Sequence, residues 1–546
     1  QTLDGTEGAV WQSWRYTLQG APVHELYNTW TPVNLGSGRT LALLSDTAEG
    51  SLDPDIFFTY LTQTTTTYSS FDSYYNPQTI TVSTSDGFTK TTANTYNNAS
   101  YIGQLTQSRV TAQAPGQTAL IRTSSFTYDS ANRLASETIE PGSTMWLTST
   151  YVYDPIFGNR IKKTVTGADI TPRDEYILQY YGNGQYVYTR TNAAGHKETY
   201  NSYDVHGSVA SLTDSNNIPT TWTYDGFGRK TQESRPGSST TLIYYLCWDG
   251  SVPASDTKCP APTGPAITRV QTETSGAGWS YTYHDIFGRV VQTNTQGFGG
   301  NWIYKQTQYD NLGRVTSVSH PYFDGETVHC TTYSHDALGR VRTITEPGPT
   351  TTDCANTSGG RVTTTTYNGL ATTVTSPPTA ASPGGQQKTT VKNSQGQVVQ
   401  AIDNPSSDNL ITTYTYDSFG NLTLASKSYD AGTDIAMTYN LRGFKTRMVD
   451  PDMGTWNYTY DVLGQMKTQT DNKGQKISMA YDPLGRMTSR VLPNGEGTST
   501  WTYGTAVPEI GKLKTVSNPN ATETYAYDSL SRVSSATTSI GGITYT

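Results

Sequence analysis

The six-residue phrase Tyr-Asp-x-x-Gly-Arg recurs along this chain and constrains its fold more than any other feature. It stands complete at residues 224–229, 309–314 and 481–486. Looser copies begin at Tyr128, Tyr203, His284, His335, Tyr416, Tyr439, Tyr460 and Tyr527. The aspartates of successive well-preserved copies lie 21 to 26 residues apart, as in the 21 residues from Asp461 to Asp482. A period of this size indicates a repeat array rather than a conventional enzyme domain.

Each repeat is predicted to be a β-hairpin. Stretches such as Trp222-Thr223-Tyr224 alternate with period two and are rich in Tyr and Thr, which suits a pleated strand. The aspartate can accept a hydrogen bond from the backbone two residues on, and the glycine can adopt a left-handed conformation. We expect the apolar residue before the glycine, such as Phe227, Phe287 or Leu312, to pack onto the sheet. The candidate structural turn residues are Asp225, Gly228, Asp310, Gly313, Asp417, Gly420, Asp461, Gly464, Asp482 and Gly485.

A single hairpin cannot bury its apolar face, so neighbouring hairpins must join into a continuous sheet. We therefore predict an all-β fold, a YD-repeat hairpin array that forms one spirally wound antiparallel sheet with almost no helix. Residues 51–546 form this array, and residues 1–50, which lack the turn, are expected to be an atypical β segment that caps it. Irregular insertions at about 247–268 and 372–388 are interpreted as surface loops, because the repeat resumes after both.

Composition excludes several classes of function. The net charge is −8 and there is no basic run, which disfavours nucleic-acid binding. Apolar stretches fall short of the roughly 18 residues that a membrane-spanning helix needs. The 39 tyrosines supply amphipathic rings whose hydroxyls we expect to face water or a polar cavity. A start at Gln1, without an initiator Met or a signal-like opening, predicts a processed product or a fragment.

The four cysteines fall into two local groups, which predicts the disulfides Cys247–Cys259 and Cys330–Cys354 in an exported protein. A metal site that adds His329 and His335 to the second pair is the alternative. It lacks the paired short ligand spacing of typical zinc sites.

The repeated residues allow more than one chemical interpretation. The aspartates could act as paired carboxylates, but an active site is made once, so their periodicity favours a structural role in the turn. The arginine after the glycine, as in Arg229 and Arg314, could form a basic ladder for acidic ligands, although pairing with acids or stacking on Tyr rings is favoured. Trp279 could stack on a sugar, although core packing is favoured. A phosphate-binding glycine loop, a nucleophile elbow and a calcium loop are missing from the sequence, and no cofactor is predicted.

The Tyr-Asp-x-x-Gly-Arg copies resemble the RHS/YD-repeat family, which includes bacterial Rhs proteins, B- and C-type subunits of Tc toxins, and animal teneurins. The resemblance covers roughly residues 50–546. It implies a β-sheet wound into a hollow shell that holds an unfolded C-terminal effector. The family's self-cleavage motif has the form Asp-Pro-x-Gly. Asp482-Pro483-Leu484-Gly485 shares that spelling but lies inside an ordinary repeat, so the protease role is not carried over.

These observations predict a non-catalytic, secreted or cell-surface shell that encapsulates or presents a C-terminal toxin or cargo polypeptide outside this chain. A surface adhesion protein that binds glycans or proteins is the alternative, and a glycan-acting enzyme on the same scaffold is a third. Neither nucleic acid, nor a membrane span, nor a cofactor belongs to any of these predictions.

Overall fold

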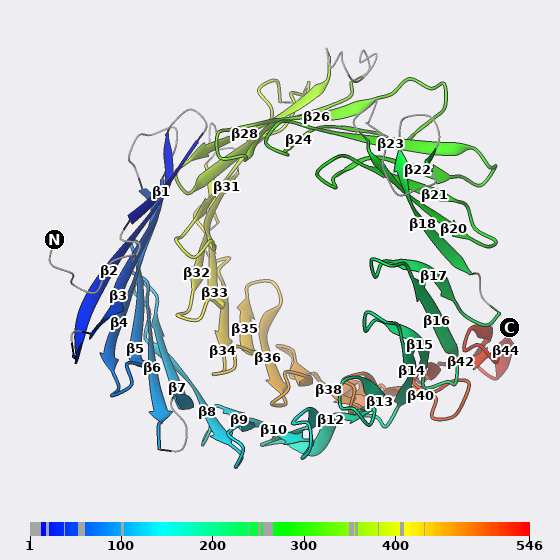
Figure 1. Ribbon diagram of the computed structural model, residues 1–546, viewed down its shortest axis with the longest axis horizontal. Coiled ribbons are helices and arrows are strands. Elements are labelled where there is room, and N and C mark those ends of the chain that lie inside the picture. Colours follow the sequence, from blue (N-terminus) through cyan, green and yellow to red (C-terminus); the bar gives the residue numbers. More distant parts are fainter. Residues whose placement is uncertain are drawn as a thin grey trace. The chain divides into compact units, whose positions relative to one another are not determined.

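A computed structural model describes residues 12–17, 21–37, 39–52, 60–99, 103–237, 240–248, 253–254, 266–348, 354, 359–380, 382–403, 409–430 and 432–546. These residues form 44 strands and one 3₁₀ turn at Pro493–Gly495. The strands belong to one sheet, and most of them pair in antiparallel fashion with the next strand of the chain (Figure 1), as between β36 and β37. The short strands β19 and β25 are passed over, so that β18 also pairs with β20 and β24 pairs with β26. The predicted all-β fold with one continuous antiparallel sheet is confirmed. No helix in this described part is long and apolar enough to cross a membrane.

The strands have the following bounds. In the first third of the chain they are β1 (Gln12–Tyr16), β2 (Pro22–Gly36), β3 (Arg39–Leu52), β4 (Tyr60–Phe71), β5 (Pro77–Thr84), β6 (Thr89–Asn97), β7 (Gln104–Gln113), β8 (Leu120–Tyr128), β9 (Leu134–Ile139), β10 (Leu147–Tyr153), β11 (Arg160–Gly167) and β12 (Ile170–Tyr180). Those of the middle third are β13 (Val187–Asn192), β14 (Lys197–Tyr203), β15 (Val209–Thr213), β16 (Pro219–Tyr224), β17 (Lys230–Ser234), β18 (Thr241–Trp248), β19 (Pro253–Ala254), β20 (Thr268–Thr274), β21 (Ser280–His284), β22 (Val290–Gln296), β23 (Trp302–Tyr309), β24 (Val315–Ser319), β25 (Tyr322–Phe323), β26 (Cys330–His335), β27 (Val341–Glu346) and β28 (Arg361–Asn368). The last third holds β29 (Ala371–Thr375), β30 (Gln387–Lys392), β31 (Val398–Asp403), β32 (Leu410–Tyr416), β33 (Leu422–Lys427), β34 (Ile435–Tyr439), β35 (Lys445–Asp450), β36 (Gly454–Tyr460), β37 (Met466–Thr470), β38 (Lys476–Tyr481), β39 (Met487–Val491), β40 (Thr498–Tyr503), β41 (Leu513–Ser517), β42 (Ala521–Tyr527), β43 (Val533–Ile540) and β44 (Ile543–Tyr545).

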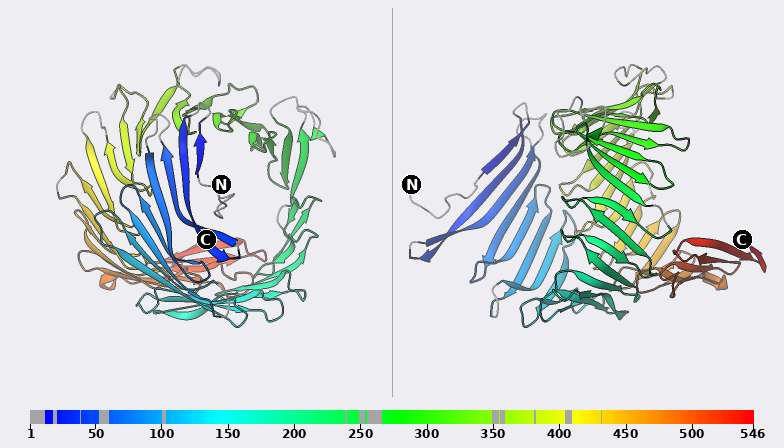
Figure 2. Two further views of the ribbon diagram at one scale, coloured as in Figure 1. Left: turned by 60° about the vertical axis from the view of Figure 1, so that its left-hand side comes forward. Right: turned by 45° about the vertical axis from the view of Figure 1, so that its right-hand side comes forward.

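The sheet divides into two compact units, each built from early and late parts of the chain. The first unit comprises residues 1–177, 366–374 and 387–500, and the second comprises 178–365, 375–386 and 501–546. In the first unit, the long early strands β2 to β8 run side by side (Figure 2). Residues 22–36 and 39–52 thus belong to the sheet as β2 and β3, and a capping role for residues 1–50 stays a prediction.

A β-bulge recurs immediately before the tyrosine of the motif. The register shifts between Thr223 and Tyr224, and again between Ala480 and Tyr481. A bulge adds local twist and re-aims the residue that follows it. The extra residue, Thr231 or Thr488, belongs to the second strand of the hairpin, opposite the tyrosine.

The two faces of the sheet differ in chemistry because successive strand residues point to opposite sides. One face carries exposed cross-strand hydroxyl pairs, such as Thr223 with Thr231 at 2.9 Å and Thr459 with Thr468 at 2.7 Å. The other face carries aromatic rings, as in Tyr458, which is 9% exposed. Such cross-strand pairs stabilise a sheet by a few tenths of a kcal/mol each, about 0.2–1 kcal/mol.

The core is thin. A compact protein of 59.5 kDa is expected to expose about 19,000 Å² of surface, whereas this chain exposes 30345 Å². The fully buried large side chains in the described part are few, among them Leu52 and Val462, each 1% exposed. Much of the stability must therefore come from contacts between neighbouring hairpins rather than from a second covering layer.

Candidate functional site

The repeated turn closes by hydrogen bonds from its aspartate. In the copy at Asp225, the carboxylate Oδ1 accepts the backbone N–H of Phe227 at 2.9 Å and of Arg229 at 3.0 Å. The N–H of Gly228 donates to the carbonyl of Asp225 at 2.9 Å. One carboxylate oxygen thus satisfies two backbone donors of its own loop, which is the mechanism expected of an Asp at a turn.

The same geometry recurs wherever the motif is placed. The aspartate Oδ1 accepts the N–H groups two and four residues on at Asp310, Asp417, Asp461 and Asp482, with distances between 2.9 and 3.0 Å. Asn393 and Asn440 take the aspartate's place in two copies and accept the same two donors. An amide oxygen therefore closes this loop as a carboxylate does, so the loop itself does not require an ionisable group at this position.

The glycine of each turn adopts a conformation that other residues rarely take. Its φ is +76° at Gly228, +81° at Gly313, +87° at Gly420, +88° at Gly464 and +80° at Gly485. Where the glycine is replaced, Asn132 and Ser531 hold φ values of +64° and +59° in its place. The predicted turn residues thus lie in equivalent positions of equivalent loops.

The arginine ties its own turn to the next one. Arg289 Nε donates to Asp285 Oδ2 at 2.7 Å, and its guanidinium lies 4.5 Å from the ring centre of Tyr309, the tyrosine of the following copy. Arg314 Nη1 reaches forward to the carbonyl of Asp336 at 2.9 Å. Both roles favoured for the arginine from the sequence, pairing with an acid and stacking on Tyr, occur together.

The tyrosine ties its turn to the preceding hairpin. Tyr224 Oη donates to the carbonyl of Val209 at 2.8 Å, and Tyr309 Oη to that of Val290 at 2.9 Å. The acceptor is the first residue of the second strand in the hairpin before. Equivalent bonds join Tyr128 to Leu105, Tyr153 to Leu134, Tyr203 to Val187, Tyr416 to Val398, Tyr439 to Leu422, Tyr481 to Met466 and Tyr527 to Leu513. The expectation that these hydroxyls face water or a cavity is wrong, because they satisfy backbone carbonyls.

At Asp72 and Asp225, hydrogen bonds at the turn lower the pKa of the carboxyl and so favour its ionised form. Burial by itself raises the pKa of Asp72, but side-chain hydrogen bonds from Asn76 and Asn98, with backbone N–H groups of Asn76 and Tyr74, lower it to about 2. Burial likewise opposes ionisation at Asp225, and hydrogen bonds from Arg229 outweigh it and lower the pKa of this carboxyl. Carboxylates held in this way are poor proton donors at neutral pH.

The apolar residue before the glycine is half-buried in three of the copies, at Leu338, Phe419 and Leu463, and exposed in four others. Exposed fractions are 86% for Phe227, 75% for Phe287, 54% for Leu312 and 36% for Leu484. The turn holds itself together through the aspartate, so it needs no apolar anchor. Phe419 is covered instead by a distant segment, with the guanidinium of Arg122 4.0 Å from its ring centre.

That contact belongs to a second set of interactions, which sequence reasoning missed. Within each unit, late turns touch early parts of the chain that lie 293 to 319 residues before them. Ser394 Oγ donates to Asp86 Oδ1 at 2.7 Å, and Val462 N–H to Asp169 Oδ1 at 3.0 Å. No periodic signal marks these partners, because the acceptors lie in variable turns between the repeats.

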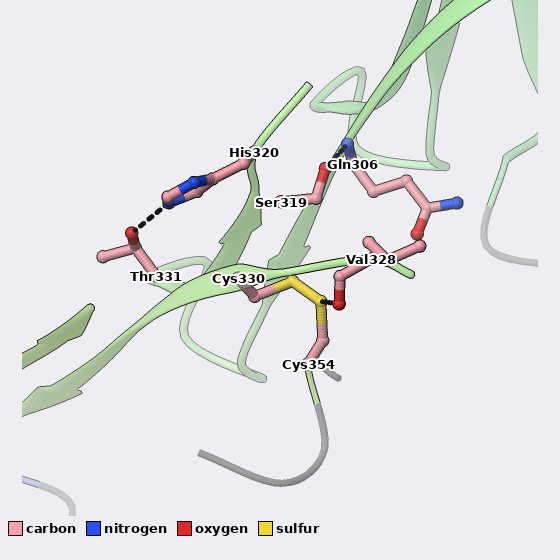
Figure 3. The surroundings of a disulfide bond; sticks show 7 residues. All are labelled: Gln306, Ser319, His320, Val328, Cys330, Thr331 and Cys354. Carbon is pink, nitrogen blue, oxygen red and sulfur yellow. Dashed lines mark hydrogen bonds between the residues drawn. A yellow bond between two sulfur atoms is a disulfide. The ribbon is translucent and has the colours of Figure 1, made fainter. Parts of the chain in front are cut away.

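The cysteines give one defined disulfide. Cys330, in β26, is bonded to Cys354 with a Cα–Cα distance of 4.8 Å (Figure 3), which is one of the two predicted pairs. Cys247 is also disulfide-bonded, but Cys259 lies outside the described residues, as does most of the insertion at 247–268. Among the residues that the structure describes, no group of three or more His, Cys, Asp or Glu side chains could hold a metal ion. Trp279, for which core packing was favoured, is 43% exposed.

Comparisons with known proteins agree with this geometry. The RHS Repeat family model matches residues 203–240 and 460–500. The crystal structure of TcdB2-TccC3 superposes with a TM-score of 0.70 at 13% identity over 97% of this chain and 39% of that one. A Tc holotoxin pore of Photorhabdus luminescens with a mutation in TccC3 gives a TM-score of 0.77 at 12% identity over 98% of this chain and 37% of that one. This chain thus spans about two fifths of those chains. The search of curated protein sequences gave no match.

Proposed function

We propose that this chain, an RHS-repeat protein by its repeats and its fold, is a non-catalytic wall that encloses or presents a toxic polypeptide lying outside these 546 residues. The observation that carries the proposal is the fold itself, an uncovered single sheet like that of the Tc-toxin shells. The chain exposes about half as much surface again as a compact protein of its mass. This large surface is typical of a wall one sheet thick rather than of a protein with a packed core.

The turns support a wall rather than a catalyst. At Asp225 both carboxylate oxygens accept hydrogen bonds within the loop, and Asn393 and Asn440 replace the aspartate in other copies without loss of the loop. The same holds at Asp482, whose Oδ1 accepts from Leu484 and Arg486 and whose Oδ2 accepts from Arg486 Nε. We therefore expect no self-cleavage at Asp482-Pro483. A purified chain that is cut near residue 485, and is not cut in Asp482→Asn, would contradict the non-catalytic role.

Enclosure can be tested by protease protection. A natively unfolded reporter polypeptide fused after Thr546 is expected to be digested at least several-fold more slowly than the same reporter alone. The matched control is the fusion that carries Gly313→Val, which disturbs a turn at φ +81° and should expose the reporter. Equal digestion rates for the free and fused reporter would rule out enclosure and leave presentation.

Secretion or display at the cell surface is part of the same proposal. The disulfide between Cys330 and Cys354 supports an oxidising environment, where such bonds form and persist. Mass spectrometry of alkylated, unreduced protein from the native source should find these two thiols blocked. Free thiols there would argue for a reducing compartment.

A further inference from the structure

A cavity of about 460 Å³ lies within the first unit, where the early strands β6, β7 and β8 meet two late turns. The two turns are residues 393–397, which join β30 to β31, and residues 417–421, which join β32 to β33. Sites for small molecules typically have volumes of roughly 300–1,000 Å³. The cavity is therefore large enough for a small organic ligand.

Side chains from one face of three neighbouring strands form the floor of the cavity. Lys90 of β6 pairs with Ala112 of β7, and Val110 of β7 pairs with Arg122 of β8. Residues that pair across an antiparallel ladder point to the same face, and so do residues two apart in one strand. The two cationic side chains thus lie on either side of a strip of β7 that is apolar.

The two late turns that form the walls are held by hydrogen bonds to early connections between strands. Ser394 donates from its N–H and its Oγ to the carboxylate of Asp86, at 2.9 and 2.7 Å. Ser418, which is 2% exposed, accepts at Oγ from Ala114 N–H at 3.1 Å and donates to the Thr118 carbonyl at 2.8 Å. Both walls are thus fixed by contacts of the protein itself, and the cavity is preformed.

The cavity is bounded along the sheet by further parts of this chain. Its floor continues into β5 on one side and into β9 on the other. The next late turn contacts the same early strand, because Arg122 Nε donates to the Leu441 carbonyl at 3.0 Å. The cavity therefore belongs to the interior of the array and not to one of its open edges.

The lining combines apolar surface with positive charge. Phe88, Val110 and Phe419 supply apolar surface, and the guanidinium of Arg122 lies 4.0 Å from the ring centre of Phe419. Lys90 and Arg122 are the charged residues of the lining, which contains no Asp or Glu. Within the described part of the chain, neither cation forms an ion pair. An apolar cavity with two uncompensated positive charges favours a ligand that is both apolar and anionic.

We propose that this cavity binds a small organic anion with a flat apolar body, such as an aromatic carboxylate. The apolar body packs against Phe88, Val110 and Phe419, and the acidic group is bound by Lys90, which is exposed. Arg122 adds a second positive charge on the other side of β7. A cationic ligand is excluded, because the lining offers no carboxylate to pair with it. The proposal does not depend on enclosure of a polypeptide by the sheet.

The test is a fluorescence titration of the full chain with 8-anilinonaphthalene-1-sulfonate, an aromatic sulfonate. We expect one saturable site per chain. The carboxylate 2-naphthoate should displace the dye about tenfold more effectively than the neutral 2-naphthamide, because only the carboxylate forms a charge-assisted hydrogen bond with Lys90. The absence of saturable binding, or equal displacement by the two compounds, would overturn the proposal.

Two variants locate the site. Lys90→Met removes the charge and keeps the length, so it should weaken the binding of 2-naphthoate about tenfold and leave that of 2-naphthamide unchanged. Phe419→Ala removes an apolar wall and should weaken both compounds. The matched control is Lys476→Met, since Lys476 is exposed in β38 of the same unit and lies outside the cavity. Circular dichroism verifies that each variant is folded. Binding that neither Lys90→Met nor Phe419→Ala changes would show that the ligand binds elsewhere and that the proposal is wrong.

Discussion

At the scale of single residues, each letter of the motif has a separate physical task. The tyrosine hydroxyl reaches the preceding hairpin, the aspartate closes its own loop, the glycine supplies a positive φ and the arginine reaches the following copy. A complete copy provides all four, whereas a looser copy such as 461–465, in which Gln465 replaces the arginine, provides fewer. A copy that loses one of them loses a defined bond.

The tyrosine hydroxyl can be tested on its own. Tyr224→Phe should lower the free energy of unfolding by about 1 kcal/mol, because the carbonyl of Val209 loses its side-chain donor. Chemical denaturation followed by tyrosine and tryptophan fluorescence measures this change. Tyr429→Phe serves as the control, since Tyr429 is 48% exposed and should change stability little.

The turn residues should separate by chemistry. Asp310→Asn should cost less than Asp310→Ala, because an amide oxygen still accepts the two backbone donors, as at Asn440, and only the ion pair with Arg314 is lost. Asp310→Ala loses both and should cost about 1 kcal/mol or more by analogy with a lost cap. Gly313→Val should cost more, because a β-branched residue is strained at φ +81°. Melting temperatures of the three variants give the order, and an Asn variant as unstable as the Ala variant would contradict the hydrogen-bond account.

The residue level was the most predictable from sequence. The turn chemistry of Asp225, Gly228 and Pro483 follows from local rules that need no tertiary knowledge. The hydroxyl of Tyr224 was assigned wrongly, because its acceptor is a backbone carbonyl in another hairpin and carries no side-chain signature. Phe227 was assigned wrongly, because a loop closed by polar bonds needs no apolar anchor.

At the scale of elements, hairpins are joined mainly to their immediate neighbours. The bulge before the tyrosine, the hydroxyl bond backward and the arginine bond forward are all made between consecutive hairpins. Stability in such an array is approximately a sum of unit and nearest-neighbour terms. The hairpin pattern was predictable for this reason. The long-range contacts of the late turns were not, because their partners Asp86 and Asp169 lie in irregular connections between repeats.

The disulfide is an element-level brace. Cys330 and Cys354 close a loop with a sequence separation of 24, which in the chain-entropy model stabilises the fold by about 3 kcal/mol. Replacement of both by serine should therefore lower the melting temperature measurably in non-reducing buffer. Adding a reductant should lower the melting temperature of the wild type by more than that of the variant, because the variant has no bridge at this place to lose.

At the scale of the whole molecule, the depressed aspartates make stability depend on pH. A carboxyl with a folded-state pKa below its unfolded value of about 3.9 contributes stability above that value and loses it as the pH falls through the folded pKa. For Asp72 the folded value is about 2, and the pKa values of Asp225, Asp310 and Asp482 are lowered as well.

The free energy of unfolding should therefore fall as the pH drops from about 5 toward 2, by the linkage between proton binding and folding. Denaturant titrations at several pH values measure the slope. Asp72→Asn, which keeps the shape but cannot titrate, should flatten part of that slope. A stability that is constant down to pH 2 would show that the turn carboxylates contribute no linkage.

The number of residues between the late turns and the early segments that they contact restricts how this gene can change. The late turns that make these hydrogen bonds meet parts of the chain 293 to 319 residues earlier, while one repeat spans 21 to 26 residues. Any single copy can decay or be exchanged for another, since all copies do the same work. Duplication or loss of a whole copy between Asp86 and Ser394 would instead move every later turn away from its partner. Substitutions within a repeat are therefore tolerated, whereas a change in the number of repeats is not.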